Sequence, residues 1–125
     1  MHFSNLQQLY ISNNALHGSI PANLDSLGSL SDLYLHNNSL TGTIPPEMWN
    51  LSILETLSLY HNLLTGAIPP ELRNLKNLSL LLLYENQLLG NIPIELGDWS
   101  SLTEIDSLEN ILQVEFQSLL EGLQI

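Results

Sequence analysis

Apolar residues recur along the chain with a fixed period, and turn-forming residues recur with them. The first leucine of each period is Leu6, Leu30, Leu54, Leu78 or Leu102. A strict period between 20 and 50 residues predicts a solenoid, because each repeat can bury its apolar face only against its neighbours. We therefore expect one domain of five repeats, over 6–29, 30–53, 54–77, 78–101 and a degenerate 102–125. Residues 1–5 are expected to be the remnant of a preceding repeat or an N-terminal cap.

The first part of each repeat has the alternation of a β-strand. In the third repeat, Leu57 and Leu59 alternate with Ser58 and Tyr60. A period of two residues places the leucines on one face of a strand and the polar or aromatic residues on the other. We expect the leucines to enter the core and the strands of successive repeats to form a parallel sheet, about 4.8 Å apart.

An asparagine follows each strand at the same position of its repeat. These residues are Asn14, Asn38, Asn62, Asn86 and Asn110. The chain must turn there, and a buried backbone group without a hydrogen-bond partner costs about 1–3 kcal/mol. Because an amide side chain both donates and accepts hydrogen bonds, we expect these residues to form a structural asparagine ladder.

A glycine and an Ile-Pro pair complete the repeat. The glycines are Gly18, Gly42, Gly66 and Gly90, and the prolines are Pro21, Pro45, Pro69 and Pro93. Glycine at a fixed position indicates positive φ or close backbone approach, and proline biases the residue before it toward an extended conformation. The three-residue spacing of the leucines that follow, such as Leu72 and Leu75, predicts a short 3₁₀ turn.

Four of the five repeats follow the pattern LxxLxLxxNxLxGxIPxxLxxLxx, as in LETLSLYHNLLTGAIPPELRNLKN at residues 54–77. This pattern resembles the plant-type leucine-rich repeat, and the chain is similar to part of the ectodomain of a leucine-rich-repeat receptor-like kinase or receptor-like protein. The resemblance implies an α/β solenoid, a right-handed leucine-rich-repeat superhelix with a parallel concave sheet and short 3₁₀ or helical turns on its convex side. In this family the array recognises partners, while a membrane span and often a kinase domain transmit the signal.

The fifth repeat departs from the pattern. Ser107 replaces the strand leucine, and Val114 and Gln117 replace the glycine and the proline. A terminal repeat must present a polar end to water, so the acidic residues Glu104 and Asp106 favour a cap. Ordinary sequence decay explains the same departures.

The charge balance excludes several classes of partner. The two bases, Arg73 and Lys76, stand against 13 acids, which gives a net charge of −11. Nucleic acids and anionic membrane surfaces are bound through Lys and Arg, so we expect neither, and the same balance favours a basic partner. The most apolar run, Leu78–Tyr84, is far shorter than the roughly 20 residues that membrane insertion needs. The chain has no cysteine, which excludes disulfides and thiolate sites.

The location of the protein follows from how far the chain extends. Met1–Tyr10 lacks the basic start and the apolar run of a secretory leader. By resemblance the chain is extracellular or membrane-associated if it is a fragment of a receptor, and cytoplasmic if it is complete. Glycosylation triplets begin at Asn37, Asn50 and Asn77, and they are used only in a secreted chain.

No residue pattern predicts catalysis or a cofactor. The sequence contains no phosphate-binding glycine loop, no HExxH and no nucleophile elbow. His36 and His61 fall on neighbouring repeats, and Glu85 is the nearby candidate for the third ligand that a metal site would need. The simpler interpretation is that both are ordinary surface histidines, at repeat positions where the residue varies. We expect a protein that is not an enzyme and holds no cofactor.

The outward residues of the strands are the candidates for recognition. The expected partner-binding face comprises Tyr10, Tyr34, His36, Tyr60, His61, Leu80, Leu82, Tyr84 and Glu85. Apolar patches mark binding surfaces and tyrosine is enriched at interface hot spots, although β-strands favour tyrosine for local reasons too. An acidic rim would steer a basic partner toward this face, and it comprises Glu85, Glu104, Asp106 and Glu109.

The leading hypothesis is a non-catalytic module that binds a peptide or protein on its concave sheet, as a segment of a receptor ectodomain would. One alternative is a soluble enzyme inhibitor similar to the plant polygalacturonase inhibitors, which share the repeat. Another is a structural or ice-binding protein, against which the lack of a regular threonine column argues. Uncovered ends of the array would expose strand edges, which predicts end-to-end self-association.

Overall fold

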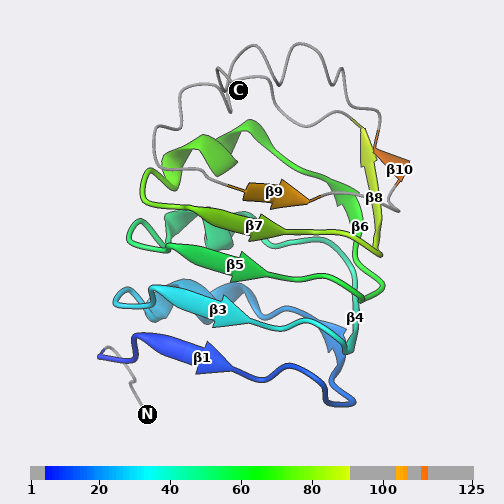
Figure 1. Ribbon diagram of the computed structural model, residues 1–125, viewed down its shortest axis with the longest axis horizontal. Coiled ribbons are helices and arrows are strands. Elements are labelled where there is room, and N and C mark those ends of the chain that lie inside the picture. The colour runs from blue at the N-terminus through cyan, green and yellow to red at the C-terminus, as the bar shows by residue number, and fades with distance from the viewer. Residues whose placement is uncertain (1–4, 91–103, 107–110, 113–125) are drawn as a thin grey trace.

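The computed structural model describes residues 5–90, 104–106 and 111–112. Its principal sheet is parallel, with the strands stacked along the solenoid (Figure 1) in the order β1 (Gln8–Tyr10), β3 (Asp32–Tyr34), β5 (Thr56–Ser58), β7 (Leu80–Leu82) and β9 (Glu104–Asp106). Neighbouring strands pair in the register of the repeat, so that Leu33 lies opposite Leu57 and Leu57 opposite Leu81. The parallel sheet is therefore confirmed. The departures noted at Ser107, Val114 and Gln117, with Glu109 and Asn110, lie outside the described residues.

A second set of short strands, which the residue pattern did not predict, follows the asparagine turns on one flank (Figure 1). Its members are β2 (His17–Ser19), β4 (Ser39–Thr41), β6 (Thr65–Ala67), β8 (Gln87–Gly90) and β10 (Ile111–Leu112). These strands pair in a register shorter than the repeat, with His17 opposite Ser39 and Thr65 opposite Gln87. A bridge between Thr43 and Thr65 links the pair β2–β4 to the group β6–β8–β10. Several of these strands contain glycine, which weakens a strand, so their residues do not show the alternating pattern by which a strand is predicted.

Short 3₁₀ helices follow the Ile-Pro pairs, on the side of the solenoid away from the principal sheet (Figure 1). They are η1 (Ala22–Ser26), η2 (Pro46–Asn50) and η3 (Pro70–Asn74). Each begins after an extended proline and ends where a leucine N–H donates to the carbonyl three residues earlier, as Leu75 does to Leu72. The predicted 3₁₀ turns are confirmed. Among the described residues, no helix has the length and apolarity to cross a membrane.

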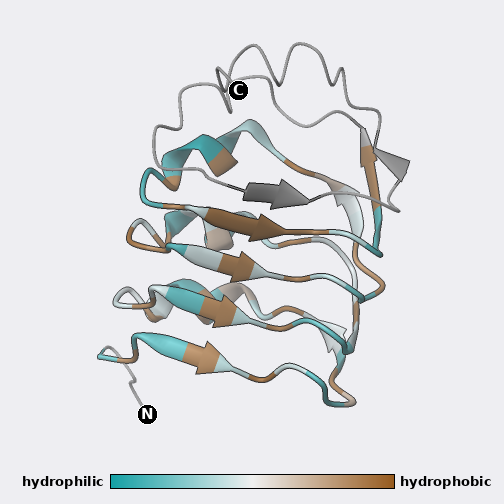
Figure 2. Cartoon of the chain, viewed as in Figure 1, coloured by the Kyte–Doolittle hydropathy of each residue, from teal (hydrophilic) through white to brown (hydrophobic). Residues whose placement is uncertain are grey.

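The core is a column of leucines between the principal sheet and the 3₁₀ helices. Leu33, Leu57 and Leu81 are fully buried on successive strands, as is Leu59, and Leu72 closes the column from η3. Figure 2 shows the apolar centres of the strands aligned along the stack. Burial of one leucine side chain contributes about 1.5–3 kcal/mol, so this column is the main source of stability.

Two columns of the solenoid have positive φ. One is the glycine column, with φ of 81° at Gly18, 75° at Gly42 and 84° at Gly66, as its fixed position predicted. The other lies where the principal strands end, and we call it the αL column: Asn13 (φ 59°), Asn37 (φ 55°), His61 (φ 53°) and Glu85 (φ 54°). It was not predicted, although consecutive asparagines at 13–14 and 37–38 were a signal for it, because asparagine tolerates this conformation.

Candidate ligand-binding face

Aromatic rings form a continuous row across the principal sheet, and we call the row the aromatic ribbon. Its members are Tyr10, Tyr34, His36, Tyr60 and Tyr84. The ring centroids are 4.6 Å apart for Tyr10 and Tyr34, 4.3 Å for His36 and Tyr60, and 4.4 Å for Tyr60 and Tyr84, with planes inclined by 14° or less. Equivalent residues of a parallel sheet lie about 4.8 Å apart, which suits aromatic stacking. The period of the sequence therefore brings the rings together.

Between Tyr34 and His36 the aromatic ribbon moves from one position of the repeat to the position two residues further along the chain. Tyr10 and Tyr34 are equivalent residues of β1 and β3, whereas the equivalents of His36 are Tyr60 and Tyr84. An edge-to-face contact joins the two stacks, with the centroids of Tyr34 and His36 6.0 Å apart and their planes inclined by 77°. One surface thus continues over four strands.

Ser58 is the small residue beside this junction. It lies opposite Tyr34 on β5, it is fully buried, and its Oγ lies 2.9 Å from His36 Nδ1. Burial lowers the pKa of the His36 imidazole below 6.5, which favours a neutral ring at pH 7. The alternation of the strand placed Ser58 on the face opposite the core leucines, yet it is buried there, and so is Thr56.

The two leucines expected on the face are half-buried rather than freely exposed. Leu80 and Leu82 belong to β7 and pair with Thr56 and Ser58 on one side and with Glu104 and Asp106 on the other. They add apolar area to the side of the ribbon, although less than a free patch would offer.

Acidic and amide groups accompany the ribbon, and bases are absent from the strands beneath it. Asp32 accepts hydrogen bonds from Gln8 Nε2 at 3.2 Å and from Ser31 Oγ at 3.0 Å. The two basic residues of the chain are Arg73 in η3 and Lys76 just after it. The principal sheet therefore carries carboxylates without a lysine or arginine on its strands.

The αL column runs along the edge of this face. Asn37 Nδ2 donates to Asn13 Oδ1 at 2.6 Å, and in the next two repeats His61 Nδ1 contacts Glu85 Oε2. The side chains of His61 and Glu85 are 62% and 39% exposed, and an open cavity of about 420 Å³ adjoins them. In the part of the chain that the structure describes, no group of three or more His, Cys, Asp or Glu side chains could hold a metal ion.

The asparagines that follow the αL column bond the backbone of their own and adjacent turns. Asn62 Oδ1 accepts from the Leu40 N–H at 3.0 Å, and Asn62 Nδ2 donates to the carbonyls of Leu35 at 3.0 Å and Leu59 at 3.1 Å. Asn38 and Asn86 make the equivalent bonds. These amides are occupied by the fold, and ligand binding falls to other side chains.

The three glycosylation triplets lie in different surroundings. Asn37 has its amide engaged with Asn13 in the αL column. Asn50 and Asn77 are exposed, and they precede the strands of the principal sheet instead of following them. Asn50 is the last residue of η2, on the side away from the principal sheet, whereas Asn77 lies between η3 and β7.

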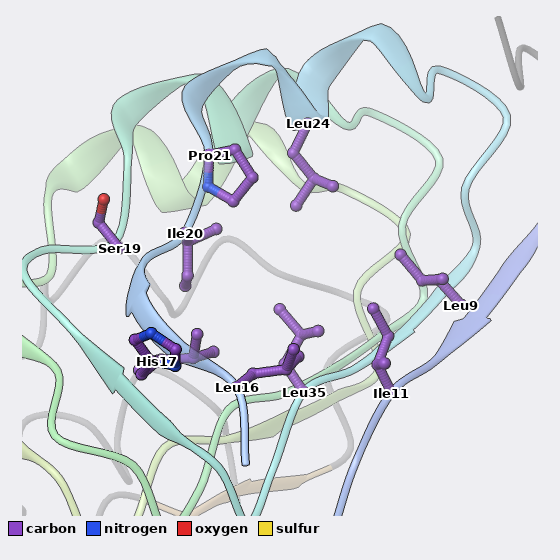
Figure 3. Close-up of a pocket in the computed structure, with 10 residues that line it drawn as sticks. Leu9, Ile11, Leu16, His17, Ser19, Ile20, Pro21, Leu24 and Leu35 are labelled. Atoms are coloured by element: carbon purple, nitrogen blue, oxygen red, sulfur yellow. The ribbon is translucent and has the colours of Figure 1, made fainter. Parts of the chain in front are cut away.

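A second cavity, of about 250 Å³, opens at the first repeat between its strand and its 3₁₀ helix. In Figure 3, Leu9 and Ile11 lie on the right of the cavity, Ile20 on its left, Leu24 at its top and Leu35 of the next repeat at its bottom. It is the apolar interior of the solenoid, exposed at this end of the described residues. Its lining is mostly apolar, with His17 and Ser19 as the polar residues, so it offers few of the polar groups that orient a specific small ligand.

These features define a leucine-rich-repeat solenoid with an aromatic face. The sequence model of the family described as Leucine Rich Repeat matches residues 5–27, 29–51 and 54–75. The chain belongs to the leucine-rich-repeat family. No curated protein sequence matches it.

Solved structures similar to the chain include plant receptor ectodomains. The ectodomain of the membrane receptor kinase GASSHO1/SCHENGEN3 from Arabidopsis thaliana, in complex with CASPARIAN STRIP INTEGRITY FACTOR 2, is 50% identical with a TM-score of 0.83, over 86% of this chain and 13% of that one. The ectodomain of the Arabidopsis receptor kinase HAESA, in complex with an IDA peptide hormone, is 38% identical with a TM-score of 0.82, over 88% of this chain and 18% of that one. The chain thus spans less than a fifth of these ectodomains.

A third similar structure has a different function. A plant ice-binding protein is 34% identical to the chain with a TM-score of 0.72, over 87% of this chain and 35% of that one. The repeat is therefore compatible with more than one kind of surface recognition, and the residues of the individual faces must distinguish them.

Proposed function

We propose that the chain is a non-catalytic recognition module that binds a basic peptide or protein segment on its concave sheet. The observation that carries this proposal is the aromatic ribbon, which extends over four strands of one face. Tyrosine contributes large contact area and hydrogen bonds at interface hot spots. The carboxylates around the ribbon and the net charge of −11 favour a positively charged partner, because complementary potentials steer association.

The similar ectodomains support a role as a segment of a receptor. One of them is in complex with a peptide hormone, and both belong to receptor kinases. The proposed location is accordingly the outside of a plant cell. In this role the chain recognises, and any catalytic step belongs to other parts of such a receptor.

The experiment uses the whole chain on a solid support and pools of randomised, acetylated and amidated heptapeptides. Retained peptides are quantified by mass spectrometry. Replacement of both Tyr60 and Tyr84 by alanine is expected to lower retention by about tenfold or more, since hot-spot truncations cost about 2 kcal/mol or more. The far-ultraviolet circular dichroism is expected to stay unchanged.

The control variant is Glu71→Ala on η3, which is exposed on the other side of the solenoid. It is expected to retain peptides as the parent chain does. Equal retention by the parent chain and the double tyrosine variant would contradict the proposal that the partner binds on the concave face.

Ice binding is the second candidate, because the second set of strands exposes hydroxyl groups. Ser19 lies opposite Thr41, and Thr43 lies opposite Thr65, in the shorter register of these strands. Three of these four residues are exposed. The two residues of each pair are not at equivalent positions of their repeats, so aligning the repeats does not show that they lie opposite each other. Thermal hysteresis that disappears in a Thr41→Lys, Thr43→Lys variant would support the candidate, whereas no hysteresis in the parent chain would exclude it.

The proposal also includes end-to-end self-association of the isolated chain. Strand β1 is an edge of the principal sheet, and the apolar cavity of Figure 3 opens beside it. Unpaired strand edges with apolar neighbours promote association.

A further inference from the structure

Glu85 occupies a backbone conformation that does not suit its side chain. Its φ is 54°, close to the values of the asparagines at the equivalent positions 13 and 37. Asparagine tolerates the left-handed region because its short amide forms local hydrogen bonds, whereas most other L-residues are strained there. Residues held in such conformations cluster at functional sites, so the surroundings of Glu85 are of interest.

The carboxylate of Glu85 adjoins the open cavity of about 420 Å³ at the edge of the concave face. The amides of Asn38 and Asn62, which also line it, already bond the backbone. The other prominent wall is Leu63, a leucine that is 46% exposed. The site therefore offers a partly exposed carboxylate beside an exposed apolar side chain.

We propose that this cavity binds a lysine or arginine side chain of the peptide partner, with the alkyl stem on Leu63 and the cationic head on the Glu85 carboxylate. Lysine and arginine combine an apolar stem with a charged end, and hydrogen bonds between ionised groups are stronger than neutral ones. Arg73 and Lys76, the two bases of the chain, lie on or next to η3 and not on this edge. The inference rests on the proposed function and names the residue that the binding face selects.

His61 is the neighbour that would compete for this carboxylate. Its Nδ1 contacts Glu85 Oε2, and its side chain is 62% exposed, so solvent adjoins the imidazole on the side to which an entering cation would displace it. Replacement by asparagine, the residue of the preceding repeats in this column, removes the competitor and keeps a residue that suits positive φ.

The test uses four heptapeptide pools that differ in a fixed central residue: lysine, arginine, norleucine or glutamate. The parent chain is expected to retain the lysine and arginine pools about tenfold better than the norleucine pool. A tenfold ratio corresponds to about 1.4 kcal/mol of binding free energy, which one hydrogen bond between charged groups can supply. Glu85→Asn is expected to abolish the preference while raising the urea midpoint, because asparagine suits φ of 54°. His61→Asn is expected to keep or sharpen the preference.

A Glu85→Asn variant that still prefers lysine and arginine would overturn the inference. Retention that depends on Tyr60 and Tyr84 but ignores the central residue would also overturn it, and the proposed function would stand. If the parent chain retains no pool, the proposed function fails and the cation site fails with it.

Discussion

The imidazole of His36 lies flat against the phenol ring of Tyr60, with centroids 4.3 Å apart and planes inclined by 9°. The same imidazole meets the ring of Tyr34 at its edge and lies 2.9 Å from the hydroxyl of Ser58. His36 is thus the residue that makes one surface out of two aromatic stacks. Its protonation state matters to the face as a whole.

Stability is expected to decrease at acidic pH through His36. Burial lowers the pKa of His36 in the folded protein below the 6.5 of an exposed histidine. The unfolded chain therefore binds the proton more readily, and the contribution of His36 is complete above pH 6.5 and is lost as the pH falls below that value. Urea unfolding across this range measures the slope.

The control for this pH effect is His36→Gln, which cannot titrate. Its free energy of unfolding is expected to change less between about pH 7.5 and pH 5.5 than that of the parent chain. Identical pH slopes for both proteins would contradict the role of His36.

Asn62→Ala is expected to lower the free energy of unfolding by about 2–3 kcal/mol, since it leaves a buried N–H without an acceptor. The N–H is that of Leu40, which donates to Asn62 Oδ1 at 3.0 Å, and Asn62 is only 6% exposed. The Leu35 carbonyl keeps a bond to Asn38, which limits the loss. Urea denaturation provides the measurement.

The matched variant is Asn14→Ala. Asn14 is exposed, and its amide bonds the carbonyls of Ile11 and Ser12 within its own turn. Its replacement is expected to cost about 1 kcal/mol or less. Equal losses for the two variants would show that burial does not determine the strength of the ladder.

Gly66→Ala is expected to destabilise the protein through both conformation and contact. Its φ is 84°, and an added Cβ would lie 2.8 Å from Thr43 Cγ2. Gly18→Ala tests conformation alone, because φ there is 81° and no atom lies within 4 Å of the added Cβ. The left-handed conformation costs alanine about 1–2 kcal/mol.

Gly28→Ala completes this series, since Gly28 has neither positive φ nor a close neighbour. The expected order of urea midpoints is Gly28→Ala highest, then Gly18→Ala, then Gly66→Ala. A Gly66→Ala variant as stable as Gly18→Ala would mean that Thr43 moves aside without cost.

Self-association of the isolated chain is expected to depend on the apolar end of the first repeat. Leu16 lines that cavity and is 37% exposed, so Leu16→Lys adds a charge where two ends would meet. Sedimentation velocity is expected to show concentration dependence in the parent chain and less in the variant. A parent chain that stays monomeric at all concentrations would disprove the prediction.

The sequence by itself determined the repeat, the parallel strands, the buried leucines such as Leu57 and the 3₁₀ turns. These features depend on local patterns that recur in each repeat, and the stacking of identical patterns allows one solution. The period of the sequence also placed Tyr60 and Tyr84 as neighbours, because equivalent residues of stacked repeats must lie one strand apart.

The tertiary structure alone decided the contacts between positions that are not equivalent. The second strands pair in a register shorter than the repeat, Tyr34 meets His36 across columns, and Ser58 is buried on the face where it was expected to be exposed. Each depends on which side chain the neighbouring repeat offers and on how the turn closes, and a periodic pattern carries no information about either.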